Sequence, residues 1–216
     1  VRDAVKLSSK IPKCHVFFCH NETYLSKQLH LAVTQHPEGL LHSMAIQELA
    51  VLVSQFGVKV GDIVGFKVNT NRLFSEKSVF DINGNKLVDL SRVAFKITTN
   101  KRRSVSVMAD RCGGLTSFAV VKSSKGKELR RFQSHNPSQI STLQSELRED
   151  KDIAQKFIIE SDEYLELKKR VVRSILSGIS PSKSEDLLVR IHDGIEIFKL
   201  ANYCKMQINA VLKVGD

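Results

Sequence analysis

The chain of 216 residues contains no tryptophan, only four cysteines and four prolines, and just 6% aromatic residues. Few, widely spaced cysteines exclude a disulfide framework of the kind that holds small secreted domains together. The scarcity of aromatic residues counts against a surface for stacking nucleic-acid bases, which needs exposed rings. Hydrophobic residues (42%) and charged residues (26%) are as frequent as in ordinary folded domains, which excludes a disordered chain or a coiled coil.

Long apolar runs are also missing. None approaches the roughly 20 residues of a membrane-spanning helix, so we expect no membrane partner. Residues 1–6 lack the apolar core, roughly 7–15 residues long, of a secretory signal. We therefore expect an intracellular protein in a reducing compartment, where its cysteines are free and mostly buried. These cysteines are Cys14, Cys19, Cys112 and Cys204.

The first 60 residues mix extended and helical patterns. The apolar run from Cys14 to Cys19 has the length of a strand. Apolar residues at helical spacing predict a helix over residues 24–35. The helix is expected to end there because Pro37 disfavours helical geometry in the residue before it. A second helix is predicted to begin after Ser43 as its cap and to end at Gly57 in the left-handed region.

Alternating apolar residues dominate the middle of the chain and predict strands. Asn83-Gly84-Asn85 separates two such segments and indicates a hairpin, because a type I′ turn requires positive φ. Further strands follow, with a break at Gly113-Gly114 and a turn over residues 123–127. We predict a β-meander of six or seven strands over about residues 61–132.

The pattern becomes helical from Ser138 nearly to the end. In the last long helix the predicted buried stripe consists of Leu188, Ile191, Ile195 and Phe198. Segregation of strands and helices argues against a parallel β-α-β sheet. The predicted fold class is α+β, with a central antiparallel β-meander of about six strands packed against N-terminal and C-terminal helices. Residues 1–135 form the mixed α/β part, and residues 138–216 form a helical part that is separate or continuous with it.

Positive charge is concentrated between Arg92 and Arg131. This stretch holds eleven basic residues and two acidic ones, a net charge of +9 in a chain whose total is +10. Two meander turns are basic, Lys101-Arg102-Arg103 and Lys125-Gly126-Lys127. In a strict up-and-down meander these turns lie at one end of the sheet, because two strands separate them.

A basic surface of this kind favours backbone phosphates, whose neutralisation releases condensed counterions. Base stacking is not expected, because Phe95, Phe118 and Phe132 are predicted to lie in the core. The alternatives are an anionic protein partner or membrane surface, and charge that serves only to keep exposed edges from aggregating. The predicted phosphate-binding residues are Lys96, Lys101, Arg102, Arg103, Lys122, Lys125, Lys127, Arg130 and Arg131.

Two constellations suggest metal chemistry. Cys14, Cys19, His30 and His36 have the spacing C-x4-C-x10-H-x5-H, but a zinc finger has about twelve residues in the middle. Cysteines five positions apart in a strand also point to opposite faces. We therefore expect buried thiols and ordinary histidines, with no metal and no cofactor.

Five of the seven histidines lie between His15 and His42, which leaves a metal-dependent nuclease as a third hypothesis. Spacings such as H-E-x-x-H, a Walker-type loop and a G-x-S-x-G elbow are absent. The sequence therefore predicts a non-catalytic protein that binds DNA or RNA and belongs to a complex with other protein subunits. The second hypothesis is an interaction or structural subunit that docks through its C-terminal helices.

Overall fold

The computed structural model describes residues 14–82, 84–100, 104–114, 116–133 and 191–213. Apart from Ile191, these belong to one compact unit formed by Val1–Ser134 and His192–Asp216. The helices predicted between Ser138 and Leu188 lie outside the described residues.

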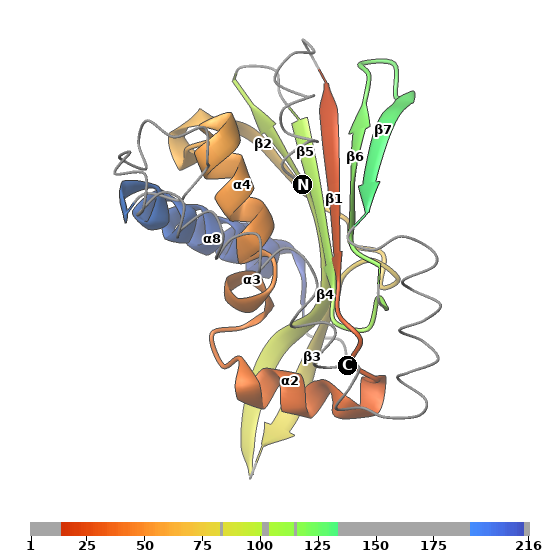
Figure 1. Ribbon diagram of the computed structural model, residues 1–216. Coiled ribbons are helices and arrows are strands. Elements are labelled where there is room, and N and C mark those ends of the chain that lie inside the picture. The colour runs from red at the N-terminus through yellow and green to blue at the C-terminus, as the bar shows by residue number, and fades with distance from the viewer. Residues whose placement is uncertain (1–13, 83, 101–103, 115, 134–190, 214–216) are drawn as a thin grey trace, which may run out of the picture. The chain divides into compact units, whose positions relative to one another are not determined.

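The described residues of this unit form seven strands and several helices (Figure 1). The strands are β1 (His15–Asn21), β2 (Ile63–Val68), β3 (Glu76–Ile82), β4 (Asn85–Thr99), β5 (Ser104–Asp110), β6 (Phe118–Lys122) and β7 (Glu128–Gln133). The α-helices are α2 (Leu29–Gln35), α3 (Leu40–Ser43), α4 (Ile46–Phe56) and α8 (Ile191–Val211), and the 3-10 helices are η1 (Ser26–Gln28) and η2 (Val60–Asp62).

All seven strands form one mostly antiparallel sheet, which confirms the predicted α+β class. Their order is β2-β4-β5-β1-β6-β7, and β3 pairs with the first half of the long β4. Strand β1 lies between β5 and β6, parallel to β5 and antiparallel to β6. A simple meander would keep β5 beside β6. The apolar β1, with Val16 and Phe18 each only 1% exposed, separates them and fills the centre of the sheet.

One face of the sheet carries the hydrophobic core. Helices α3, α4 and α8 pack on this side of the sheet (Figure 1). The core between these helices and the sheet includes Leu49 of α4, Leu200 of α8 and Phe18 of β1. Burying one such side chain contributes about 1.5–3 kcal/mol, and in β4 and β5 alternate apolar residues face this layer.

The predicted buried stripe of the last helix is wrong. Ile195 and Phe198 are 54% and 58% exposed, whereas Leu200, Cys204 and Ile208 are completely buried. Apolar residues recur at helical spacing on more than one side of α8, so the pattern did not select a face. The small Ala201 and Cys204 lie on the buried side, where small side chains let a helix approach a sheet closely.

The predicted hairpin turn and the predicted end of α4 are confirmed, whereas the predicted helix cap at Ser43 is wrong. Ile82 pairs with Asn85 across a two-residue hairpin loop, and Gly84 has a φ of 81°. Gly57 ends α4 with a φ of 60°, as predicted. Ser43, however, is the last residue of α3 rather than a cap, and its hydroxyl donates to the carbonyl of Gly39 at 3.1 Å.

Register shifts change which residues face the core. In β2 the pairs Ile63–Thr99 and Gly65–Thr98 leave Val64 as an extra residue, a β-bulge. Val64 is therefore 67% exposed, although its spacing from Phe66 and Val68 predicted that all three share a face.

Candidate nucleic-acid interface

Three strands meet in register at one end of the sheet. His15 pairs with Ser104 on one side and with Lys122 on the other. The first residues of β1 and β5 therefore lie beside the last residue of β6. We call this region, with the β6–β7 turn over residues 123–127, the hairpin end of the sheet. It lies at the top of Figure 1.

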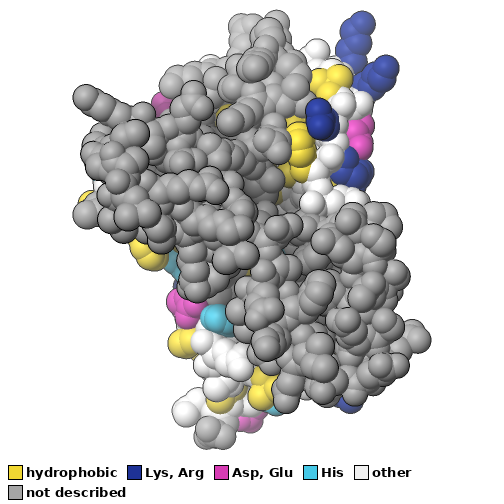
Figure 2. Space-filling model, in the orientation of Figure 1, with side chains coloured by type: hydrophobic (Ala, Val, Ile, Leu, Met, Phe, Trp, Pro, Cys, Tyr) yellow, Lys and Arg dark blue, Asp and Glu magenta, His cyan; other side chains and the backbone are white. Residues whose placement is uncertain are grey.

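The basic β6–β7 turn extends from this end. The amide of Ser123 donates to the Lys127 carbonyl at 2.9 Å, and Gly126 has a φ of 82°. Lys125 and Lys127 are both exposed. Figure 2 shows Lys and Arg side chains gathered at the upper right, where Figure 1 places the β6–β7 hairpin.

Arg130 and Arg131 follow on β7, with different surroundings. The Arg130 guanidinium lies 5.4 Å from the centre of the Phe132 ring. Arg131 lies 4.7 Å from the centre of the Phe118 ring and donates two hydrogen bonds to Glu128, at 3.2 and 2.9 Å. The charge of Arg131 is thus partly balanced, whereas Arg130 has no ion-pair partner among the described residues.

Lys96 and Lys122 flank His15 from β4 and β6. Burial lowers the pKa of His15 below its ordinary value of 6.5, and the positive charges of Lys96 and Lys122 lower it further. A hydrogen bond with the Ser104 backbone opposes this shift, and the Ser104 hydroxyl also lies 2.6 Å from the His15 Nδ1 atom. Burial is the larger cause, and the two lysines add positive charge to this part of the sheet.

The other predicted basic turn, Lys101-Arg102-Arg103, lies outside the described residues. Asn100 and Ser104, which precede and follow it, are at the hairpin end. The two basic turns were expected at one end of the sheet on the basis of an up-and-down order. Insertion of β1 keeps Asn100 and Ser104 at the end of the sheet that carries the β6–β7 turn, because β6 still runs antiparallel to β5.

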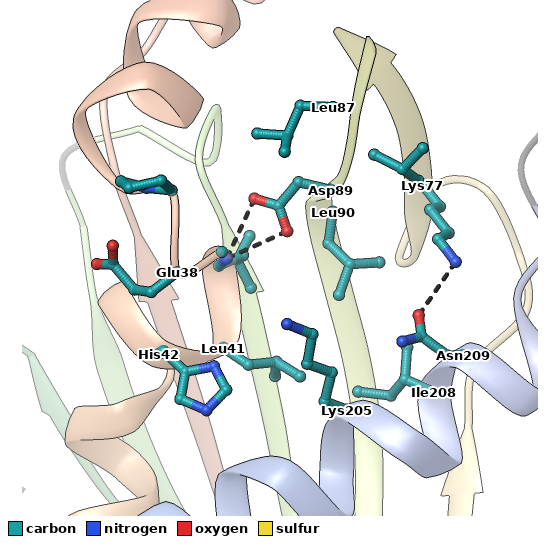
Figure 3. A pocket seen from close by; sticks show the side chains of 14 residues that line it. Glu38, Leu41, His42, Lys77, Leu87, Asp89, Leu90, Lys205, Ile208 and Asn209 are labelled. Atoms are coloured by element: carbon teal, nitrogen blue, oxygen red, sulfur yellow. Dashed lines mark hydrogen bonds between the residues drawn. The ribbon is translucent and has the colours of Figure 1, made fainter. Parts of the chain in front are cut away.

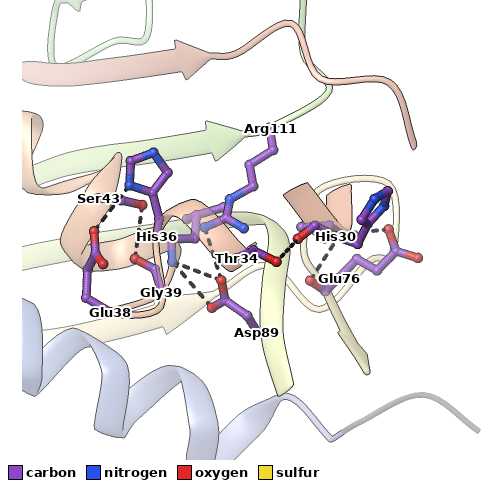
Figure 4. Close-up of polar contacts among 11 residues, drawn as sticks. His30, Thr34, His36, Glu38, Gly39, Ser43, Glu76, Asp89 and Arg111 are labelled. Carbon is purple, nitrogen blue, oxygen red and sulfur yellow. Dashed lines mark hydrogen bonds and ion pairs between the residues drawn. The ribbon is translucent and has the colours of Figure 1, made fainter. Parts of the chain in front are cut away.

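Two arginines of the basic stretch are paired with acidic residues instead. Arg111 is 1% exposed, and its Nη2 atom lies 3.1 Å from Asp89 (Figure 4). Both carboxylate oxygens of Asp89 also accept from the Leu40 amide, at 3.3 and 3.2 Å. Arg92 pairs with Glu76 at 3.2 Å. The +9 charge of the stretch therefore overstates what its surface can offer to a ligand.

The histidines are dispersed among separate contacts. His20 lies 3.1 Å from Glu48, and His36 lies 3.4 Å from Glu38. His42 is 3.2 Å from Asn202 and stacks on Phe198. Among the described residues, no three His, Cys, Asp or Glu side chains form a group that could hold a metal ion.

All four cysteines are free thiols, and only Cys112 is not buried. Burial raises the pKa of Cys19 to about 11 and that of Cys204 to about 12. Protonated thiols at these positions are neither nucleophiles nor ready metal ligands.

A small pocket lies between α3, the β3–β4 hairpin and α8, with a volume of about 210 Å³ (Figure 3). Its polar groups largely bind one another. Asp89 accepts from the Leu40 amide, and the Lys77 ammonium donates to Asn209 at 3.1 Å. These contacts join α3, the sheet and α8, so we assign the pocket a structural role.

Sequence reasoning missed the residues on the face of the sheet opposite the core. Phe118 was predicted in the core, but its neighbour Ala119 faces the core and Phe118 lies 5.8 Å from Phe17 on the other side. Phe95 is in the core as predicted, and Phe132 packs partly buried against it. The signal for Phe17 was available, because an unbroken apolar run in β1 places apolar side chains on both faces.

No family model, curated protein or solved structure matches this chain. No helix in the described part of the chain combines the length and apolarity needed to cross a membrane.

Proposed function

We propose that this chain is a non-catalytic nucleic-acid-binding protein that contacts backbone phosphates through the hairpin end of its sheet. The observation that supports this most directly is the register of His15 with both Ser104 and Lys122. It brings the basic β6–β7 turn to the end of the sheet at which β5 begins. Such a protein would act on DNA or RNA as a subunit of a nucleoprotein assembly, in the reducing compartment that its free thiols suit.

Lysines on a short turn suit phosphate contacts better than base reading. The exposed Lys125 and Lys127 flank Gly126 on a turn whose backbone is held by hydrogen bonds. Flexible ammonium groups neutralise phosphates as point charges, and such contacts orient a protein without reading sequence. The described basic residues that we assign to this role are Lys96, Lys122, Lys125, Lys127, Arg130 and Arg131.

Binding of a fluorescent duplex to the full chain, measured from 50 to 200 mM salt, tests the proposal. We expect the association constant to fall steeply with salt. The double variant Lys125→Glu/Lys127→Glu should bind at least about tenfold more weakly. Its salt slope, the slope of the logarithm of the association constant against the logarithm of the salt concentration, should be shallower by roughly 1.8, or about 0.9 for each phosphate that is no longer neutralised. The triple variant Lys101→Glu/Arg102→Glu/Arg103→Glu should weaken binding as well.

The matched control is Lys86→Glu/Lys205→Glu, which reverses two exposed lysines on β4 and α8, away from the hairpin end. This control should bind like the wild-type protein. Affinity that does not change with salt, or equal losses in both double variants, would exclude the hairpin end as a phosphate site.

One observation favours the second candidate, an interaction subunit. Helix α8 exposes four large apolar side chains, which are Ile195, Phe198, Met206 and Val211. Replacement of Ile195 and Phe198 by Ser would then abolish association with a protein partner while nucleic-acid binding stayed unchanged. The reverse pattern, with loss only in the Lys125→Glu/Lys127→Glu variant, supports nucleic-acid binding.

A further inference from the structure

Six side chains form one transverse row across the sheet, on the face opposite the core. Strand register pairs Lys67 with Lys96, Lys96 with Ser106, and Ser106 with Phe17. It then pairs Phe17 with Val120, and Val120 with Arg131. We call this row and its neighbours the second face. Six strands at about 4.8 Å spacing make the row roughly 24 Å long.

Positive charge gathers at both ends of the row. Lys67 and Lys96 are exposed and directly opposite each other on β2 and β4. Like charges in this arrangement destabilise a sheet. Neither lysine has an ion-pair partner in the part of the chain that the structure describes. At the other end lies Arg131, whose charge Glu128 partly balances, with Lys122 in the adjacent row. A bound anion would relieve the repulsion between Lys67 and Lys96.

A groove of about 480 Å³ opens on the second face between these lysines and the loop that follows β2. Its apolar lining includes Phe17, Phe74 and Met108, and its polar lining includes Lys67, Lys96 and Asn69. Phe74 is 40% exposed. Aromatic rings beside paired lysines provide stacking contacts and phosphate contacts within one groove.

We propose that the second face binds single-stranded nucleic acid, with bases stacked on Phe17 and Phe74 and phosphates held by Lys67 and Lys96. Val120, the next residue of the row after Phe17, is only 1% exposed, so the proposed site is the groove at the Lys67 end of the row. This inference rests on the proposed function and gives it a substrate class. Bases in a duplex stack on each other, so only an unpaired strand offers base faces to protein rings.

The occupant is identified by charge complementarity combined with aromatic contact. An acidic peptide would satisfy the lysines but would make no use of ring faces in the groove. Nucleic acid uses both, because every base has an aromatic face and every nucleotide carries a phosphate. Aromatic residues are scarce in the chain as a whole, yet three of them, Phe17, Phe74 and Phe95, line this groove, so their scarcity does not exclude base stacking here.

The test is equilibrium binding of the full chain to a fluorescent oligothymidylate of 20 nucleotides and to a duplex of equal length. Phe17→Leu and Phe74→Leu should each weaken single-strand binding about tenfold, the size expected when one base no longer stacks, and leave the salt slope unchanged. Phe17→Tyr should retain affinity. Lys67→Gln/Lys96→Gln should instead make the single-strand salt slope shallower by roughly 1.4, or about 0.7 for each charge.

Two controls match these variants. Phe198→Leu removes a ring on α8 that is more exposed than Phe17 and Phe74, and Lys86→Gln/Lys205→Gln removes two exposed lysines elsewhere. Both should bind single strands like the wild-type protein. Thermal unfolding of each variant checks that the fold is retained, and Phe17→Tyr provides the rescue if Phe17→Leu is less stable.

The outcomes separate this inference from the proposed function. If duplex and single strand bind equally, and only Lys125→Glu/Lys127→Glu weakens binding, the hairpin end stands and the stacking site is refuted. If neither nucleic acid binds, both proposals fail. If polyglutamate displaces the oligonucleotide as effectively as unlabelled oligothymidylate, the second face is an acidic-peptide site and the inference is overturned.

Discussion

Arginines of one basic stretch have opposite roles, which their burial decides. Arg111 is 1% exposed and pairs with Asp89, whereas Arg92 and its partner Glu76 are 27% and 41% exposed. Removing one partner of a buried ion pair leaves the other charge uncompensated, whereas exposed pairs contribute little. Arg111 and Arg92 carry the same charge, but their ion pairs therefore contribute very different amounts to the stability of the fold.

Arg111→Met should lower the free energy of unfolding by about 3 kcal/mol, the low end for a broken buried pair, because Asp89 keeps its bonds to the Leu40 amide. Arg92→Met, the matched control, should cost about 0–1 kcal/mol. Urea unfolding curves measure both values. Similar costs for the two variants would mean that the Arg111–Asp89 pair is not a structural centre.

Backbone conformation at single positions also fixes how α3 meets the sheet. Gly39, which precedes α3, has a φ of 90°, and a Cβ atom there would lie 2.9 Å from the Oδ1 atom of Asp89. Gly57, at the end of α4, has a φ of 60° and open space around it. Substitution of Gly57 therefore tests backbone strain alone, whereas substitution of Gly39 tests backbone strain together with a steric clash.

Gly57→Ala should destabilise the protein by about 1–2 kcal/mol, the cost of a left-handed residue with a side chain. Gly39→Ala should cost about 1–3 kcal/mol more, because its methyl group displaces Asp89 from the Leu40 amide. Thermal or urea unfolding gives both values. If Gly39→Ala costs no more than Gly57→Ala, Asp89 can move freely and does not anchor α3.

The fold was predictable where local chemistry determines it. The Asn83-Gly84 turn, the left-handed Gly57 and the core-facing Val105, Val107 and Ala109 all follow from residue type and spacing. The insertion of β1 between β5 and β6 was not predictable, because strand pairing between distant segments leaves no local pattern.

Local features of β2 and α8 explain why the sequence predicted the wrong buried side chains in these two elements. A single extra residue in β2 turns Val64 outward, and the adjacent Gly65 was the local signal for that bulge. Helix α8 has apolar residues on more than one side, so only its packing against the sheet selects Leu200 over Phe198. At the candidate site, charge pointed to the hairpin end, while the pairing of Lys67 with Lys96 required the strand register.

At the scale of the whole molecule, the sheet concentrates like charges from separate strands around one histidine. Lys96 on β4 and Lys122 on β6 lower the pKa of His15, which burial has already lowered, and Ser104 on β5 opposes them. A histidine whose pKa is lower in the folded state than in the unfolded chain binds fewer protons when folded. Stability therefore rises with pH through the interval below 6.5.

We expect the free energy of unfolding to fall as the pH is lowered from 7.5 to 5, and His15→Gln to reduce that fall. Gln removes the titrating group and can still form a hydrogen bond with Ser104. Urea midpoints of both proteins at pH 7.5 and pH 5 measure the difference, in which contributions common to both proteins cancel. A bound oligonucleotide should diminish this pH dependence in the wild-type protein, because its phosphates favour protonated His15 and offset the charges of Lys96 and Lys122. An equal fall in both proteins would show that His15 does not sense the charge gathered on this sheet.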